Sequence, residues 1–257
     1  MNEVLNPRRL WLLIRSDLVA DYRTDAIVCG TLTAVMLLIS MFTVAQGNET
    51  STYYLSWYYG GLFIWSPIVA SFSFRELHDK ARNEAYLLLP ASALEKMLAR
   101  LLGTTVVFFL FLLIFMSVAS ALIEGINLLV FGRRNGLFNA SHEAVWAPVG
   151  HFLVVVSLYF LGAAWFRKLH YIKTALTLTV IPIGLICLAA FVAWMVFDGS
   201  GSFQISEREG RSFYLAYRGL FDALLVALQI LYFVVVPLFC WYVAWLRVKE
   251  TEVSHGV

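Results

Sequence analysis

Long, nearly uncharged apolar stretches constrain the fold of this chain more than any other feature. A helix needs roughly 20 apolar residues to cross the hydrocarbon core of a bilayer. Six stretches are of about this length, namely Ala26–Ala45, Tyr53–Phe74, Leu98–Leu122, Val149–Phe166, Thr174–Phe197 and Leu220–Leu246. The stretches are continuous rather than alternating, which favours helices over the strands of a β-barrel. The sequence therefore predicts an all-α membrane protein, with residues 1–257 forming a single domain of six transmembrane helices.

The composition agrees with a membrane protein. Hydrophobic residues make up 60% of the 257 residues and charged residues only 14%, whereas a soluble domain carries about 25% charged residues. The three cysteines lie inside apolar stretches, and their spacing indicates neither a metal site nor a disulfide framework. The net charge of +2 gives no reason to expect binding to nucleic acid.

The positions of Lys and Arg indicate how the spans are oriented. If the N-terminus lies in the cytoplasm, the outer segments hold only Arg133, Arg134, Arg208, Arg211 and Arg218, out of 19 Lys and Arg residues. Positive charge accumulates on the cytoplasmic side of membrane proteins. This distribution predicts that both termini are cytoplasmic. The aromatic cluster Tyr53, Tyr54, Trp57, Tyr58 and Tyr59 is then expected at the outer headgroups, where Trp and Tyr are enriched.

The segment before the first span, residues 6–22, is expected to be an interfacial helix on the inner membrane surface. At about 100° per residue, Arg8, Arg9, Arg15, Ser16 and Arg23 fall on one arc. Leu10, Trp11, Leu13, Ile14 and Leu18 fall on the other. A solvated lead-in helix is the alternative interpretation.

The connection between the second and third spans, residues 75–96, is highly charged at its start. Glu76 and Lys80, and Lys80 and Glu84, are four residues apart, a spacing at which opposite charges stabilise a solvated helix. Pro90 should end that helix, because proline lacks the backbone N–H group that a helix interior requires. The leucines at 87–89 then form an apolar corner, which either packs under the bundle or contacts a partner.

Ser92 is predicted to restart the chain as a helix. Ser92 and Glu95 have the spacing of a capping box, in which each side chain bonds the backbone N–H group of the other residue. The third span therefore begins in the cytoplasm, with Lys96 and Arg100 expected at the inner headgroups.

Residues 74–96 resemble the first cytoplasmic loop of ABC-2-type transporter permeases, especially those of a bacterial branch. The resemblance is carried by Phe74-Arg75-Glu76-Leu77-His78, by Tyr86-Leu87-Leu88-Leu89-Pro90-Ala91-Ser92 and by Glu95-Lys96. Elsewhere it rests on the layout, an interfacial N-terminal helix followed by six spans. The resemblance implies an ABC exporter subunit in a bacterial inner membrane, paired with a second membrane subunit as a homodimer or a heterodimer.

The same resemblance implies that residues 75–96 are a coupling segment, which docks in a cleft on a cytoplasmic ABC ATPase subunit. The polar contacts would be Arg75, Glu76, Asp79, Arg82 and Glu84, and the apolar anchor would be Tyr86 and Leu87. The chain contains no glycine-rich phosphate-binding motif and no other catalytic motif. It is therefore expected not to be an enzyme, with ATP and Mg bound by the partner subunit.

Two further classes of function remain open. One is a non-transporting membrane anchor, sensor or transmitter of ATPase motion, and the other is a membrane-embedded enzyme. No ionisable residue lies in the middle of the first five expected spans, which disfavours a proton-driven transporter. Asp222, near the start of the sixth span, is expected to pair with Arg218 on the same helix. Pro67, Pro182 and Pro237 fall within spans and fit either a gating hinge or a static kink.

Overall fold

The computed structural model describes residues 6–20, 22–75, 91–166, 169–196 and 207–254, and these form helices without any strand. The elements in chain order are α1 (Pro7–Ala20), α2 (Tyr22–Ala45), α3 (Tyr53–Gly60), η1 (Gly61–Trp65), α4 (Ser66–Phe72), α7 (Ala93–Leu102), η2 (Gly103–Val107), α8 (Phe108–Phe131), α9 (Glu143–Trp146), α10 (Val149–Trp165), α11 (His170–Val196), α12 (Glu207–Ile230), η3 (Leu231–Val235) and α13 (Val236–Ser254). The prediction of an all-α membrane protein is confirmed at this level.

Five helices in the described part of the chain are long and apolar enough to cross a membrane. They are Tyr22–Ala45, Ala93–Phe131, Glu143–Trp165, His170–Met195 and Tyr217–Glu250. The expected second span is also helical, as α3, η1 and α4 in succession, but its tyrosines, serines and glycines make it less apolar than the other five. Six spans therefore remain a prediction, with this helix as the one to test.

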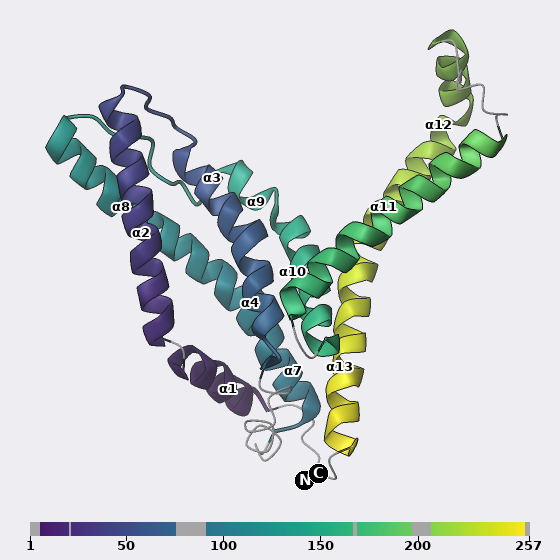
Figure 1. The fold of residues 1–257 in the computed structure, drawn as a ribbon, viewed down its shortest axis with the longest axis horizontal. Coiled ribbons are helices and arrows are strands. Elements are labelled where there is room, and N and C mark those ends of the chain that lie inside the picture. The colour runs from purple at the N-terminus through teal and green to yellow at the C-terminus, as the bar shows by residue number, and fades with distance from the viewer. Residues whose placement is uncertain (1–5, 21, 76–90, 167–168, 197–206, 255–257) are drawn as a thin grey trace.

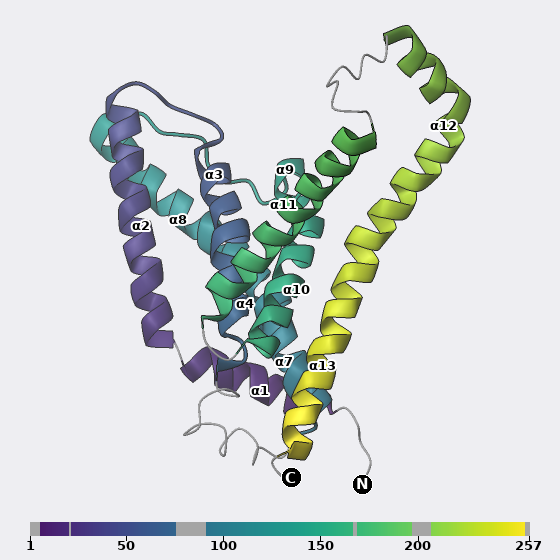
Figure 2. The same ribbon diagram turned by 45° about the vertical axis from the view of Figure 1, so that its right-hand side comes forward.

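The helices run between two ends of the molecule (Figures 1 and 2). Helix α1 lies across one end, where it packs against α7, and α13 ends at the same end of the molecule. We call this end the inner end, in line with the predicted orientation. Helix α10 occupies the middle of the bundle and packs against α4, α11 and α13. Helices α11 and α12 run in roughly the same direction away from the inner end, with a gap between their ribbons in Figure 2.

Three π-helical turns interrupt the long helices, and all three pack against α10. Two of them, η1 and η3, end two residues before a proline, Pro67 and Pro237 respectively. Proline cannot donate to the carbonyl four residues earlier and its ring crowds that carbonyl, so a wider preceding turn accommodates it. In η2 the hydroxyls of Thr104 and Thr105 instead bond the carbonyls of the preceding turn.

The helix of the expected third span is longer than the span itself. That span was expected to end at Leu122, and its helix continues to Phe131, where Gly132 ends it with a positive φ of 66°. This extension places Glu124 in a helix that is apolar enough to cross a membrane, beyond the stretch whose middle was expected to hold no ionisable residue. Glu124 is only 1% exposed.

Candidate functional site

The predicted ATPase interface falls mainly outside the described residues. Glu76, Asp79, Arg82, Glu84, Tyr86 and Leu87 all lie in the undescribed range 76–90. Arg75 is described, and it is exposed just beyond the end of α4. Phe74, the residue before it, is buried and packs edge-on against Phe160 of α10, with ring centroids 4.8 Å apart. The described structure therefore shows how the residue before the predicted interface packs on α10, whereas most of the predicted interface lies outside the described residues.

The start of α7 is closed by the predicted capping box. The backbone N–H of Glu95 donates to the Ser92 hydroxyl at 3.2 Å, and the backbone N–H of Ser92 donates to the Glu95 carboxylate at 2.9 Å. The second oxygen of that carboxylate accepts the backbone N–H of Asn6 at 2.7 Å. Glu95 is fully buried. One side chain thus fixes the starts of α7 and α1 together.

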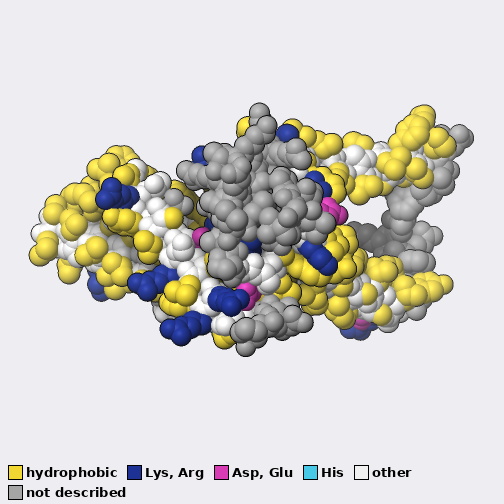
Figure 3. Space-filling model, turned by 90° about the horizontal axis from the view of Figure 1, so that it is seen from below, with side chains coloured by type: hydrophobic (Ala, Val, Ile, Leu, Met, Phe, Trp, Pro, Cys, Tyr) yellow, Lys and Arg dark blue, Asp and Glu magenta, His cyan; other side chains and the backbone are white. Residues whose placement is uncertain are grey.

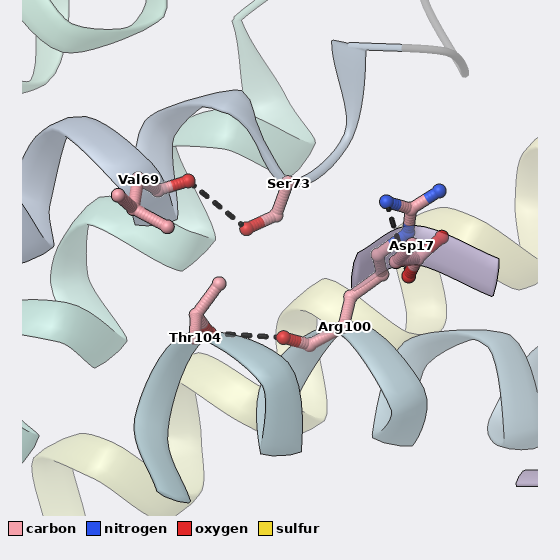
Figure 4. A network of polar contacts seen from close by, with 5 residues as sticks. All are labelled: Asp17, Val69, Ser73, Arg100 and Thr104. Atoms are coloured by element: carbon pink, nitrogen blue, oxygen red, sulfur yellow. Dashed lines mark hydrogen bonds and ion pairs between the residues drawn. The ribbon is translucent and has the colours of Figure 1, made fainter. Parts of the chain in front are cut away.

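A second contact joins α1 to α7 further along both helices. Arg100 Nη1 lies 3.2 Å from Asp17 Oδ2, with both side chains partly buried (Figure 4). We call the residues Asn6, Asp17, Ser92, Glu95 and Arg100 the inner joint. The joint attaches α1 at two points, about three turns apart, to the helix α7, which begins within the last residues of the predicted coupling segment.

The end of α4 lies in the same region of the molecule as Asp17 and Arg100. Figure 4 shows the Ser73 hydroxyl donating to the Val69 carbonyl at 3.5 Å, and the Thr104 hydroxyl donating to the Arg100 carbonyl at 2.9 Å. Helix α4 packs against η2, in which Thr104 lies. The described residues before position 76 therefore lie beside η2, which begins three residues after Arg100 of the inner joint. Lys96, expected at the headgroups, is instead buried in α7.

The interfacial prediction for α1 is changed in its detail. Ile14 is buried and Leu10 and Leu13 are partly buried, so one apolar face packs on the bundle. Trp11 and Leu18, which were grouped with these residues, are instead exposed. The helix is covered on one face only.

A second polar site, which the sequence prediction missed, surrounds Glu124 near the other end of the bundle. We call Ser40, Tyr54, Glu124, Asn127 and Asn135 the outer polar cluster. One carboxylate oxygen of Glu124 accepts the hydroxyls of Tyr54 at 2.5 Å and of Ser40 at 2.8 Å. The other accepts the backbone N–H of Asn135 at 2.7 Å and the side-chain amide of Asn127 at 3.1 Å.

The outer polar cluster links three helices and a loop. Ser40 lies in α2, Tyr54 in α3, and Glu124 and Asn127 in α8, while Asn135 follows α8. The Asn135 side chain also accepts the backbone N–H of Thr50, from the connection between α2 and α3. Every group that faces Glu124 in this set is a donor, an arrangement that suits a carboxylate anion. Such a saturated arrangement acts as a structural tie more readily than as a proton path.

The tyrosines of α3 do not behave as a headgroup belt. Tyr54 and Tyr58 are fully buried. Tyr58 donates to the Val145 carbonyl at 2.9 Å and Tyr59 to the Ala144 carbonyl at 3.0 Å, both at α9. Buried phenols need an acceptor. These side chains therefore hold α3 to its neighbours instead of marking the outer headgroups.

The described residues offer no group of three or more His, Cys, Asp or Glu side chains that could hold a metal ion. Arg218 and Asp222 lie 3.7 Å apart on α12, both largely exposed, which confirms the expected pair. Compared with known proteins, the chain matches no family model, no curated sequence and no solved structure.

Proposed function

We propose that this chain is the membrane subunit of an ATP-driven exporter of the ABC-2 type, which forms the translocation path and couples to a separate ATPase subunit. It would work in a bacterial inner membrane together with a second membrane subunit, identical or different. Its residues 75–96 would dock on the ATPase, with Arg75, Glu76, Asp79, Arg82 and Glu84 as polar contacts. Tyr86 and Leu87 would anchor the contact.

The inner joint is the observation that carries this proposal. A docking segment transmits force only if its ends are attached to the helices that must move. Glu95, near the end of the segment, and Arg100, just after it, both lie in α7; Glu95 accepts a hydrogen bond from Asn6, directly before α1, and Arg100 pairs with Asp17 of α1. Phe74, directly before the segment, is packed on the central helix α10. Movement of the segment would therefore reach α1, α7 and α10 together.

The α1 contacts favour a coupled unit over a loose anchor. A buried carboxylate with hydrogen bonds from two elements is costly to separate, because each unpaired buried group costs about 1–3 kcal/mol. A membrane anchor would need no such connection between its lead-in helix and its third helix. A subunit that only transmits ATPase motion would need it as much as a transporter does.

The test uses the full-length chain co-expressed with each ABC ATPase that the source genome encodes and reconstituted in liposomes with the one that co-purifies. A fluorescent phospholipid analogue serves as the probe, and both ATP hydrolysis and probe movement are measured. The double variant Glu76→Ala/Arg82→Ala should insert normally, keep basal ATP hydrolysis and lose probe movement. The matched control Glu143→Ala/Arg134→Ala changes one acid and one arginine on the predicted outer side and should behave as the wild type.

Three results would count against the proposal. No ATPase retained through purification would remove the partner. ATP hydrolysis without movement of any amphiphilic probe would favour the transmitting subunit. Normal coupling in the Glu76/Arg82 double variant would remove residues 75–96 from the interface.

A further inference from the structure

The outward face of α1 carries arginines and large apolar side chains together. Arg8, Arg9 and Arg15 are all exposed. The exposed apolar side chains are Trp11 (60%), Leu12 (53%), Leu18 (47%) and Val19 (58%). Residues three or four apart are neighbours on a helix surface, so Arg15 lies between Trp11 and Val19. Arg9 lies close enough to the Glu95 carboxylate to interact with it, so we call the other six residues, without Arg9, the α1 outer face.

Negative charge on α1 is directed away from this face. Asp17 is the one acid in the described helix, and it is engaged with Arg100 of α7 inside the inner joint. The buried Ile14 points in the same general direction, toward the bundle. The helix therefore separates its charges, with the Asp17 carboxylate bound to Arg100 and the guanidinium groups of Arg8 and Arg15 presented outward.

The first membrane helix fixes the level at which this face lies. Helix α2 begins at Tyr22, two residues after α1 ends, and it is apolar enough to cross a membrane. Bilayer that covers α2 must place its phosphate layer near the α1–α2 corner. Figure 3, which views the inner end, shows Lys and Arg side chains over the part that carries α1, with hydrophobic side chains between them. At the level of the lipid headgroups, phosphate groups solvate arginine side chains and the start of the acyl chains solvates apolar ones.

We propose that the α1 outer face is a binding surface for anionic phospholipids of the inner leaflet. Guanidinium groups bind phosphate through paired N–H donors, and exposed Trp and Leu side chains insert at the boundary between headgroups and acyl chains. A polar partner protein would leave the apolar part of the face unsatisfied, whereas a phospholipid matches both parts. This inference does not rest on the transport function proposed above.

Native mass spectrometry of the detergent-purified full-length chain tests the assignment, with titrations of dioleoyl phosphatidylglycerol and dioleoyl phosphatidylcholine. The wild type should bind phosphatidylglycerol more tightly. The double variant Arg8→Gln/Arg15→Gln should lose that preference by roughly fivefold for each arginine removed. The matched variant Arg133→Gln/Arg134→Gln removes two exposed arginines at the opposite end and should keep it. Trp11→Ala should weaken the binding of both lipids to a similar degree.

Equal affinity of the wild type for the two lipids would overturn the proposal. So would an unchanged preference in the Arg8/Arg15 variant. If that variant kept its lipid preference but lost a co-purifying ATPase, the α1 outer face would be a protein interface instead. A change in thermal unfolding midpoint, measured for each variant, identifies losses caused by misfolding, and Arg8→Lys/Arg15→Lys should restore most of the preference.

Discussion

The hydroxyl of Tyr54 donates a 2.5 Å hydrogen bond to the carboxylate of Glu124, across 70 residues of sequence and between two helices. Both side chains are about 1% exposed. The same carboxylate accepts from Ser40 of α2 and from the backbone of Asn135. The Glu124 carboxylate therefore joins helices α2, α3 and α8 through hydrogen bonds. It lies at the end of the bundle opposite the inner joint.

Replacing Glu124 should destabilise the protein strongly. Glu124→Leu leaves several buried donors without an acceptor, and each unsatisfied group costs about 1–3 kcal/mol. Tyr54→Phe removes one donor and should cost about 1–3 kcal/mol. Thermal unfolding in detergent measures both effects, and Glu143→Leu, at an exposed position, is the control. A Glu124→Gln variant that loses activity but unfolds normally would instead indicate a proton-transfer role.

Sequence periodicity located the long helices and the Ser92–Glu95 capping box because both signals are local. Glu124 was missed because the apolar stretch weakens after Leu122, while hydrogen bonds from residues 11 to 84 positions away make burial of the acid possible. The tyrosines of α3 were misplaced for a related reason. Their composition matches a headgroup belt, but their acceptors, Glu124 and the Val145 carbonyl, are known only once the helices have packed.

The α1 prediction shows the same limit. A helical wheel separates arginines from apolar residues, but it cannot tell which apolar residues face the bundle and which face lipid. Asp17 falls among the apolar residues on that wheel, and its side chain pairs with Arg100. Residues that break a local pattern are thus informative about tertiary contacts, although the partner has to come from the structure.

The close approach of α10 to α11 depends on Gly162. A Cβ atom added at this position would lie 1.9 Å from the Thr174 hydroxyl oxygen, so Gly162→Ala forces the helices apart. We expect a cost of about 1–3 kcal/mol, typical of overpacking, and a lower unfolding midpoint. Thr174→Ala should recover part of the loss in the double variant. Gly184→Ala, where nothing lies within 4 Å, should leave the midpoint unchanged.

The Asp17–Arg100 pair should matter more for coupling than for stability. Partly exposed ion pairs contribute about 0–1 kcal/mol, so Asp17→Asn should change the unfolding midpoint little. If α1 and α7 move together during transport, the same variant should reduce probe movement per ATP hydrolysed. The charge-swapped double variant Asp17→Arg/Arg100→Asp should restore it in part. Full coupling in Asp17→Asn would separate α1 from the transmission path.

The helix of α3, η1 and α4 should cross the membrane despite its tyrosines and serines. A cysteine at position 48 should then react with an impermeant maleimide added outside intact cells, while a cysteine at position 75 should react only after permeabilisation. Both natural residues, Asn48 and Arg75, are exposed, so neither substitution disturbs packing. Reaction of both cysteines from the same side would leave five spans and place the two ends of the chain on opposite sides.

Site-specific photo-crosslinking is the most direct test of the central claim, which is that residues 75–96 bind an ATPase subunit. A photoreactive amino acid replaces Arg82 in the full-length chain, and Arg134 in the control, and both variants are co-expressed with the ABC ATPases of the source genome. The account predicts an adduct between position 82 and the ATPase that changes in yield when ATP is trapped, and no adduct from position 134. An ATPase adduct from position 134 alone, or no adduct from position 82 under any nucleotide condition, would contradict it.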